Sequence, residues 1–423
     1  MTHTDCVVIG GGQAGLAVSC CLARRAIGHV VLERGRIAER WQSERWDSLR
    51  LLTPNWQSRL PGWRYAGPDP DGYMTMAEVT RYLQDYARSF GAPVETGAGV
   101  RSVERGRAGF VVATDRGTYT APAVVIATGH CDRPFVPRAA AGLAPGITQV
   151  TPREYRHPAQ LPPGGVLIVG ASATGVQLAE EIHRSGRPVT IAAGHHTRLP
   201  RRYRGRDILW WFDRMGIFDE TADGVYDVDV SRHQPSLQLV GRDDHGSIDL
   251  LRLQALGVRV TGRLTAVAGR KVRLADDLVA TTAASDVKLA SLLARIDTFA
   301  GEAGGAFDLA PAEPFEPSWP AFTSAPTSVD LAAEGVATVV WATGFTRAYP
   351  WLRVPVLDRR GEIRHHGGVT PEAGLFVLGL NFLRRRKSSF IDGVGDDAAA
   401  IAAGIAAHLE GRRAVVARGA SVP

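Results

Sequence analysis

The stretch VVIGGGQAGLAVS, residues 7–19, has the pattern of a buried strand, a glycine-rich turn and the start of a helix. Gly10, Gly12 and Gly15 form the spacing G-x-G-x-x-G at the point where the strand ends. Glycine suits these positions because the backbone bends sharply, approaches a pyrophosphate and lets helix and strand pack closely. Free N–H groups at the helix start favour phosphate. The stretch therefore predicts a dinucleotide-binding βαβ unit rather than an ordinary strand-to-helix turn.

The same pattern returns in VLIVGASATGVQLAEE, residues 166–181. Gly170 and Gly175 keep the outer positions, and Ser172 takes the middle one. A serine side chain is small enough to admit a phosphate, and its hydroxyl can donate a hydrogen bond. A duplicated strand-turn-helix pattern predicts an α/β fold with two Rossmann-like dinucleotide-binding domains.

The strands that follow the two turns differ in the residue at their end. HVVLER ends in Glu33, and an acid there accepts hydrogen bonds from ribose hydroxyls, which suits FAD. PVTIAAG has no acid at the matching place and is followed by HHTRLPRRYRGR. Arg198, Arg201 and Arg202 offer paired donors to a 2′-phosphate, which predicts NADPH. The alternative is that these arginines form a solvated surface run.

Two further apolar strands, AVVIATG and VVWATG, end at Gly129 and Gly344. The second of them suggests that the first domain resumes after an insertion. We therefore expect an FAD-binding domain made of residues 1–158 and 335–423, with an NADPH-binding domain, residues 159–334, inserted into it. A Thr75–Glu78 capping pattern predicts a helix up to Gly91.

The composition excludes several classes of function. The 49 lysine and arginine residues against 43 acidic ones give a net charge of +6, which does not demand a nucleic-acid partner. Cys6, Cys20, Cys21 and Cys131 form no CxxC pair and no metal-ligand spacing, so no metal site and no dithiol reductase is expected. Neither a leader pattern nor a run of roughly 20 apolar residues is present, which predicts a soluble, cytoplasmic protein without membrane association.

Taken together, these motifs resemble those of class B flavin monooxygenases, in a bacterial group related to flavin-containing monooxygenases and the plant auxin-forming enzymes. The motifs are GGGQAG, Glu33 with Arg34, RW at 40–41, RLLTPNWQSRLPG, both ATG ends, GASATG, RLPRRYRGRDILWW and GVGDD. The resemblance implies an enzyme that uses FAD, NADPH and O2 and that oxygenates a small molecule through a flavin C4a-hydroperoxide, at nitrogen or sulfur. Few obligatory side-chain catalysts are expected, since the cofactor carries the chemistry. A homodimer is compatible with this interpretation, which leaves the oligomeric state open.

The predicted site residues follow from the motifs and the resemblance. For FAD they are Gly10, Gly12, Gln13, Ala14, Gly15, Glu33, Arg34, Trp41, Val100, Ala127, Thr128, Gly129, Gly395 and Asp396. For NADPH they are Gly170, Ser172, Ala173, Thr174, Gly175, Thr197, Arg198, Arg201, Ala342, Thr343 and Gly344. The resemblance implies that Asn55 lies near flavin C4a, against the alternative of a turn residue after proline.

One departure from the family leaves alternatives open. Many flavin monooxygenases and Baeyer-Villiger enzymes carry F-x-G-x-x-x-H-S/T-x-x-W/Y before the NADPH domain. PGITQVTPREY keeps only Tyr155, with Thr151 in place of the histidine and Ile147 in place of the second glycine. An NADPH:acceptor oxidoreductase or oxidase of the same fold is therefore an alternative, Baeyer-Villiger oxidation is another, and a non-catalytic nucleotide-sensing partner is a third.

Two other segments have two interpretations each. ILWWF, residues 208–212, either lines the substrate side or packs in the core. The basic run Arg384–Lys387 either attracts an acidic substrate or NADP phosphates, or forms a solvated loop.

Overall fold

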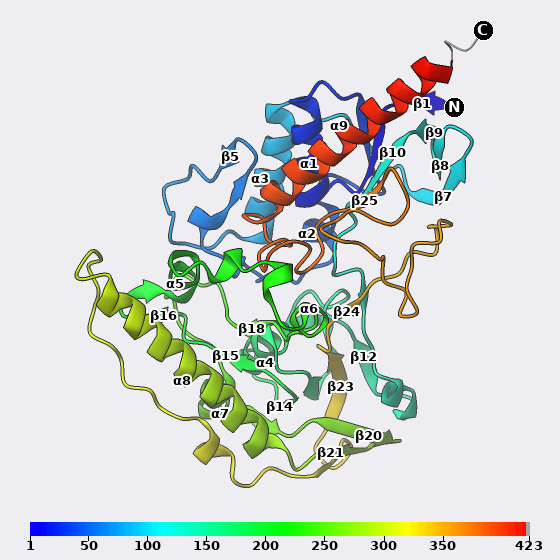
Figure 1. The fold of residues 1–423 in the computed structure, drawn as a ribbon. Helices are drawn as coiled ribbons and strands as arrows, with labels where there is room; N and C mark the ends of the chain where they lie inside the picture. Colours follow the sequence, from blue (N-terminus) through cyan, green and yellow to red (C-terminus); the bar gives the residue numbers. More distant parts are fainter. Residues whose placement is uncertain (420–423) are drawn as a thin grey trace.

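The computed structural model describes residues 1–419, with side chains up to residue 414, and shows two α/β units stacked along the long direction of the molecule (Figure 1). The upper unit holds both the first and the last described elements of the chain, and the middle of the chain forms the lower unit. This is the predicted architecture, in which the second dinucleotide-binding unit is inserted into the first.

The first unit is built on a parallel five-stranded sheet. Its central strand β2 is buried at all four positions and continues into the first glycine-rich turn. Apolar runs of this kind are typical of parallel strands that are covered on both faces. In sheet order the strands are β25 (Leu375–Val377), β10 (Ala123–Ile126), β2 (Cys6–Ile9), β3 (His29–Glu33) and β6 (Val94–Thr96).

Three main helices cover this sheet. The predicted capping box is present at the start of α3 (Met76–Ser89), where the Thr75 hydroxyl accepts from the Glu78 N–H and the Glu78 carboxylate accepts from the Thr75 N–H. Helix α1 (Gln13–Ala23) lies beside the C-terminal helix α9 (Val394–Gly419), as Figure 1 shows. The short helix α2 (Glu39–Ser43) follows β3.

A smaller sheet stands at the edge of the first unit. It consists of β1 (Thr2–His3), β9 (Gly117–Ala121), β8 (Gly109–Thr114) and β7 (Val100–Gly106), of which β7, β8 and β9 are antiparallel. The excursion between α2 and α3 contains the hairpin of β4 (Arg59–Leu60) and β5 (Trp63–Arg64).

The second unit repeats the parallel sheet, and it begins earlier and ends later than predicted. In order its strands are β12 (Thr148–Val150), β23 (Val336–Trp341), β13 (Gly165–Val169), β14 (Val189–Ala192) and β19 (Arg259–Thr261). Both β12 and β23 were assigned to the first domain by the boundaries at 158/159 and 334/335. That assignment is corrected here, because a buried strand that ends in ATG has the same pattern in either sheet and only the hydrogen-bonded partner tells them apart. Residues 420–423 of the predicted domain lie outside the described chain.

Around this sheet the second unit carries its own helices and small ribbons. The 25-residue helix α8 (Leu278–Glu302) runs along the lower edge in Figure 1. The other helices are α4 (Ala173–Arg184), α5 (Ile208–Arg214), α6 (Val228–Arg232) and α7 (Leu250–Leu256). The antiparallel sheet is β20 (Leu264–Ala268), β21 (Lys271–Leu274) and β22 (Ser328–Asp330), and the two-stranded ribbons are β15 (Thr197–Arg198) with β18 (Leu237–Gln238) and β16 (Arg202–Tyr203) with β17 (Arg206–Asp207).

The two crossings between the units run side by side. After the first ATG the chain forms β11 (Arg133–Pro134), and after the second ATG it forms β24 (Phe345–Thr346), and these strands pair antiparallel. The Phe135 N–H donates to the Gly344 carbonyl at 2.9 Å. Both connections are thereby held at one place between the units.

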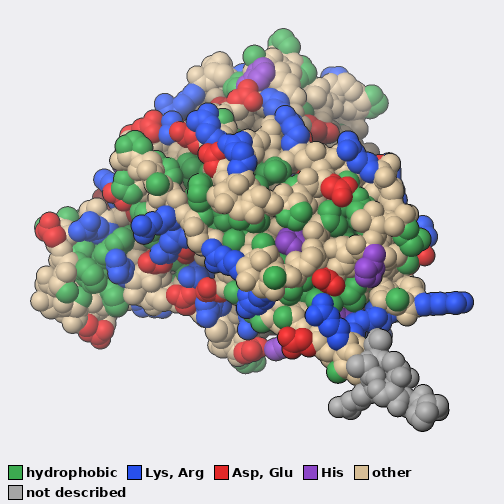
Figure 2. Space-filling model, turned by 90° about the horizontal axis from the view of Figure 1, so that it is seen from above, with side chains coloured by type: hydrophobic (Ala, Val, Ile, Leu, Met, Phe, Trp, Pro, Cys, Tyr) green, Lys and Arg blue, Asp and Glu red, His purple; other side chains and the backbone are tan. Residues whose placement is uncertain are grey.

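The surface seen from above mixes Lys, Arg, Asp, Glu and apolar side chains without one dominant basic patch (Figure 2). Within residues 1–419, no helix combines the length and apolar character that crossing a bilayer requires.

Candidate active site

A cavity of about 990 Å³ begins at the first glycine-rich turn and extends between the two units. Near the turn it is lined by Gly10–Ala14, β3, α2 and the residues that follow β10. Farther on it is lined by segments from residue 197 to 239, by α8 and by residues 379–391. A single space therefore joins the predicted flavin site to side chains of the second unit.

The first turn has the geometry that a bound pyrophosphate needs. Gly10 has φ +112°, and a Cβ there would meet the Ala127 carbonyl oxygen at 2.6 Å. A Cβ at Gly15 would overlap the Gly10 carbonyl oxygen, so this glycine serves close packing and does not line the cavity. Around Gly12 there is open space, and α1 begins there without a side-chain cap. Uncapped N–H groups beside open space fit the phosphates of FAD.

Glu33 lies at the cavity wall as predicted and is 8% exposed. Its carboxylate accepts from the Gly11 N–H at 2.7 Å and from the Gly35 N–H at 2.9 Å. Because each carboxylate oxygen has two lone pairs, acceptor sites remain for ribose hydroxyls.

Trp41 also lines the cavity, and its indole N–H donates to the Gln13 side chain at 3.4 Å. Gln13 in turn donates to the Ser389 carbonyl at 3.5 Å. Arg34, Val100, Ala127, Thr128, Gly129 and Thr197 line the cavity too. Predicted cofactor residues from six separate parts of the chain thus line one cavity, and Thr197 is among them although it was predicted for NADPH and not for FAD.

Just beyond the first ATG lies a polar cluster that the sequence prediction missed. Cys131 lines the cavity next to Arg40, Arg45 and His130. Burial raises the pKa of the Cys131 thiol, but the hydrogen bond and charge of His130 and the charges of the two arginines outweigh it and lower the pKa to about 7. The cavity wall therefore carries a thiol that is partly ionised at neutral pH. Adjacency to an ATG end was the available sequence signal.

The second turn repeats the backbone geometry of the first. Gly170 has φ +108°, and a Cβ at Gly175 would overlap the Gly170 carbonyl oxygen. Ser172 stands before α4 in extended backbone and makes no side-chain cap, so the helix N–H groups stay available. The turn residues Gly170–Gly175 and the strand end Ala342–Gly344 lie outside the cavity lining. These groups fit a second dinucleotide phosphate at a separate edge.

Two of the three arginines predicted to bind the 2′-phosphate, Arg198 and Arg201, are engaged elsewhere, and the prediction is corrected for these two. Arg202 is exposed, and its assignment stays a prediction. Arg198 forms ion pairs with Asp249 at 3.0 Å and Asp286 at 2.8 Å, with its side chain 15% exposed. Arg201 is fully buried, pairs with Asp207 and donates to the Leu52 carbonyl. Charges that are already paired and desolvated are not available to a nucleotide phosphate. A run of arginines in the sequence does not reveal which carboxylates the fold brings to it.

Asn55 is placed as a structural residue, in agreement with the alternative interpretation. It is 4% exposed, its amide donates to the Asp69 carbonyl at 2.9 Å, and its side-chain oxygen accepts from the Met74 N–H at 2.9 Å. It does not line the cavity. The amide joins two loops, so the predicted catalytic role is not supported by this position.

The start of α9 is also displaced from its predicted contact. Gly395 packs near Pro61, and Asp396 is largely exposed and pairs with Arg385 at 2.6 Å. Neither residue lines the cavity, whereas the neighbouring Ser389, Phe390 and Ile391 do. The cavity wall is therefore formed by the segment just before this helix.

The segment that departs from the family pattern forms a local cap. The N–H and hydroxyl of Thr151 both donate to Glu154, at 2.9 and 2.8 Å. Tyr155 is fully buried and its hydroxyl donates to Glu181 at 3.0 Å. Thr151 thus fills the histidine position with a turn-stabilising side chain, which gives no support to Baeyer-Villiger chemistry.

The two segments with alternative interpretations, residues 208–212 and 384–387, each agree in part with both of them. In α5, Leu209 and Phe212 line the cavity while Trp211 is fully buried in the core. In the basic run, Arg386 lines the cavity and pairs with Glu220 at 2.5 Å.

Comparison with known proteins agrees with this architecture. The chain is 32% identical over 402 residues to an uncharacterised CzcO-like oxidoreductase of Geobacillus kaustophilus, covering 94% of this chain and 97% of that one. The chain belongs to the CzcO-like oxidoreductase family. Residues 7–205 also match a family model described as pyridine nucleotide-disulphide oxidoreductase.

Outside the CzcO-like family, this oxidoreductase is similar to flavin monooxygenases. It is 30% identical over 223 residues to the indole-3-pyruvate monooxygenase YUCCA6 of Arabidopsis thaliana, covering 48% of this chain and 51% of that one. A flavin-containing monooxygenase from Stenotrophomonas maltophilia has the same fold, with a TM-score of 0.67, 21% identity and coverage of 97% and 100%. The predicted class, fold and cofactor pair, FAD with NADPH, agree with this family and fold.

Proposed function

We propose that this CzcO-like oxidoreductase is an NADPH- and FAD-dependent monooxygenase that transfers one oxygen atom of O2 to nitrogen or sulfur of a small molecule. The observation that carries the proposal is the single cavity that runs from the Glu33 side of the first turn to α8 of the second unit. A flavin bound there supplies the activation of O2. Similarity to a plant monooxygenase and to the fold of a bacterial one supports the same activity.

In this proposal the chain's own residues bind, orient and exclude water. Glu33 and the open start of α1 hold the adenosine end of FAD, and Trp41 with Gln13 closes one side of the cavity. The second turn holds the phosphates of NADPH on α4. Apolar walls between the units keep water from the reacting atoms.

For the 2′-phosphate we propose Arg263 in place of the corrected arginines. The last strand residue before the first turn, Ile9, is paired with Leu32, and the last one before the second turn, Val169, is paired with Ala192. Glu33 follows Leu32 and Ala193 follows Ala192, so Ala193 is the residue that matches Glu33. Beside the following residue, Gly194, the Arg263 side chain passes with its Cδ 3.6 Å from the place of a Cβ. Arg263 is exposed and makes one weak contact, 3.5 Å to Asp277. Its guanidinium stays available for a phosphate.

The experiment is a balance of NADPH, O2 and product with the FAD-loaded protein. Methyl phenyl sulfide, N,N-dimethylaniline and cyclohexanone serve as acceptors under ¹⁸O2. We expect one ¹⁸O atom in the sulfoxide or N-oxide for each NADPH consumed, and none in a lactone. If NADPH is consumed with every acceptor but all O2 returns as H2O2, the monooxygenase is excluded.

A second candidate is an NADPH:acceptor oxidoreductase, and Cys131 favours it. A thiol with a pKa of about 7 at the cavity wall is suited to attack a disulfide, and the matching family model carries a disulphide oxidoreductase description. The same experiment with 5,5′-dithiobis(2-nitrobenzoate) in place of O2 tests it. Because Cys131 has no CxxC partner, its attack would release one thiolate and leave a mixed disulfide, which two electrons supplied by NADPH would have to cleave to release the second thiolate. NADPH-dependent release of two thiolates per disulfide, lost in Cys131→Ser, is the expected result of this candidate.

A further inference from the structure

We propose that the part of the cavity between the first turn and α8 binds an amphipathic anion, a carboxylate with an aromatic or aliphatic body. This inference rests on the proposed function and names the substrate class for it. It follows from the distribution of charge along the cavity wall, from the surroundings of Arg232 and from one face of α8.

The cavity has two ends with different charge. Acidic side chains Glu33, Glu39, Asp115 and Asp132 line the end at the first turn. Glu39, Asp115 and Asp132 are paired with arginines there. From residue 197 onward the described lining residues include no carboxylate, but four cations, Arg232, Lys288, Arg295 and Arg386. A low-dielectric cleft lined by one sign of charge concentrates ligands of the opposite sign.

Arg232 has little compensation for its burial. Its side chain is 23% exposed, and within the described part of the chain it forms one ion pair, with the largely exposed Asp229 at 3.7 Å. Its Nε is buried and has no hydrogen-bond partner among the described residues. Burial lowers the pKa of Arg232, and Arg347 nearby adds a second positive charge. A buried, poorly paired guanidinium is costly unless an anion completes it.

Besides Asp229, the carboxylate whose charge acts on Arg232 is Glu362, and Glu362 is engaged by another arginine. Arg347 is itself paired with Glu362 at 2.6 Å. Burial, together with the charges of Arg232 and Arg347, lowers the pKa of His365 to about 4, so this histidine is neutral and does not compete for the anion. The remaining donors of Arg232 reach only the Phe382 carbonyl, at 3.4 Å. A carboxylate in the cavity would supply the negative charge that the Arg232 guanidinium lacks.

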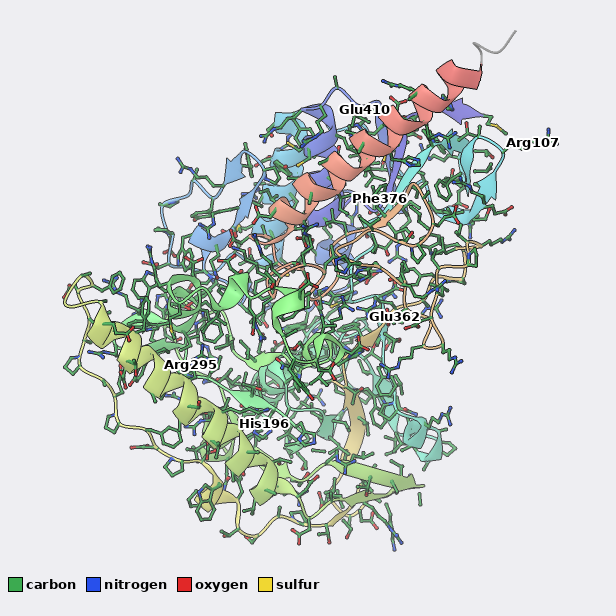
Figure 3. All side chains as sticks on the ribbon, viewed as in Figure 1. Arg107, His196, Arg295, Glu362, Phe376 and Glu410 are labelled. Atoms are coloured by element: carbon green, nitrogen blue, oxygen red, sulfur yellow. The ribbon has the colours of Figure 1, made fainter. Side chains whose placement is uncertain are left out.

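Helix α8 presents a second pair of cations to the same cavity. Lys288, Leu292 and Arg295 follow each other at helical spacing and all line the cavity. Lys288 and Arg295 form no ion pair with any described residue, whereas Arg386 is paired with Glu220. Figure 3 marks Arg295 in the part of α8 that lies closer to the first unit. In this proposal the two exposed cations attract the anion, and the less exposed Arg232 pairs with its carboxylate.

The walls between these cations are apolar and partly aromatic. They consist of Leu199, Leu209, Phe212, Phe218, Leu237, Leu239, Leu292, Phe382 and Phe390. An apolar body with one charged end matches walls of this kind, which bury the body while a few polar groups fix the orientation. A nucleotide phosphate shares the anionic chemistry, but the second turn, where its pyrophosphate would bind, lies outside this lining.

The test compares 4-phenylbutyrate with its neutral amide, 4-phenylbutanamide, by calorimetry on the FAD-loaded protein. FAD content and anaerobic reduction by NADPH are measured first, so that failure of the proposed function is recognised separately. The variants are Arg232→Ala and the double variant Lys288→Ala/Arg295→Ala. Arg252→Ala on α7, an exposed arginine away from the cavity, is the matched control.

We expect the acid to bind wild-type protein about tenfold or more tightly than the amide, because a charge-assisted hydrogen bond contributes on that scale. Each cavity variant should bind the acid about tenfold more weakly than wild type and bind the amide with unchanged affinity. Arg252→Ala should bind both compounds as wild type does. Equal binding of acid and amide overturns the proposal, as does an equal loss in the control. Loss of NADPH affinity in place of acid affinity assigns the cations to the cofactor and also overturns it. If Arg232→Ala does not fold, the exposed double variant decides.

Discussion

Gly10 and Gly170 open the two turns with φ angles of +112° and +108°, and the helices that follow both begin without a side-chain cap. The residues around the two turns differ much more. Glu33 reaches back to the first turn with a hydrogen bond to Gly11, while Ala193 stands at the matching place in the second unit. The comparison teaches that strand-to-helix packing fixes the backbone of the turn, and we propose that the end of the next strand decides which nucleotide each turn holds.

The largest expected effect comes from replacing the last glycine of either turn, Gly15 or Gly175, with alanine. A Cβ at Gly15 or Gly175 would overlap the carbonyl oxygen of Gly10 or Gly170. We expect Gly15→Ala and Gly175→Ala to lower the free energy of unfolding by about 3 kcal/mol or more, since helix and strand must separate. Urea denaturation followed by circular dichroism measures this.

The matched control is Gly411→Ala in α9, where a Cβ meets open space. That change should raise the free energy of unfolding by about 0.5–1 kcal/mol, because alanine loses less backbone entropy than glycine in a helix. Unfolding free energies of Gly15→Ala and Gly175→Ala close to wild type would contradict the packing role.

The middle position should separate the turns. Gly12 has open space around its Cα, and Ser172 already carries a Cβ in the same extended backbone. We expect Gly12→Ala to fold normally yet bind FAD at least about tenfold more weakly, because its methyl group occupies the approach of the pyrophosphate. Ser172→Ala should leave both FAD and NADPH affinity within about twofold.

Quenching of flavin fluorescence on titration of the apoprotein measures the FAD affinity. The melting temperature of each apoprotein shows that the fold is intact. An unchanged Kd for FAD in Gly12→Ala would mean that the phosphates lie elsewhere.

The preference for NADPH over NADH tests the role proposed for the end of the second strand. Arg263→Ala should raise the Kd of NADPH about tenfold through loss of a charge-assisted contact, and leave NADH unchanged. Arg273→Ala, an exposed arginine on β21, is the control. Calorimetry with 2′,5′-ADP gives a readout that does not depend on turnover. Equal weakening of NADPH and NADH would remove Arg263 from the 2′-phosphate site.

The smallest effect concerns the residues after the two ATG ends, Cys131 in the first unit and Thr346 in the second. Because the pKa of Cys131 is lowered to about 7, its thiolate fraction rises as pH increases through that value. Alkylation by iodoacetamide should therefore accelerate with a midpoint near pH 7. Burial raises the pKa of Cys6 and, to about 11, that of Cys21, so these thiols should react slowly.

Mass spectrometry of the alkylated chain, with Cys131→Ser as the control, identifies the site. Bound FAD should slow the reaction, since Cys131 lines the same cavity as the first turn. A midpoint above pH 8.5 would show that His130 and the two arginines do not lower the pKa of this thiol.

Much of the cofactor site could be predicted from the sequence because local patterns carry it. Gly10, Gly12 and Gly15 lie in a turn that joins a strand to the helix that follows it, and Glu33 ends the next strand. The resemblance added Trp41 and Val100, which also reach the cavity. The glycines and Glu33 could be predicted because they belong to a short, regular βαβ unit, and their contacts with FAD stay a prediction.

Other assignments depended on contacts that no local pattern contains. Arg198 and Arg201 had the right residue type, but the fold brings Asp249, Asp286 and Asp207 to them. Strand β23 was assigned to the wrong sheet, because its pairing with β12 and β13 is long-range.

The sequence by itself determined that there are two dinucleotide-binding units, since buried strands and glycine spacing follow from backbone sterics. Only the tertiary structure decided which charges stay unpaired or weakly paired. Arg263, Arg232 and the α8 cations differ from the other arginines in their neighbours, not in their local sequence. Electrostatic availability depends on partners brought together from distant parts of the chain, and that is why the substrate side could be argued only once the fold was known.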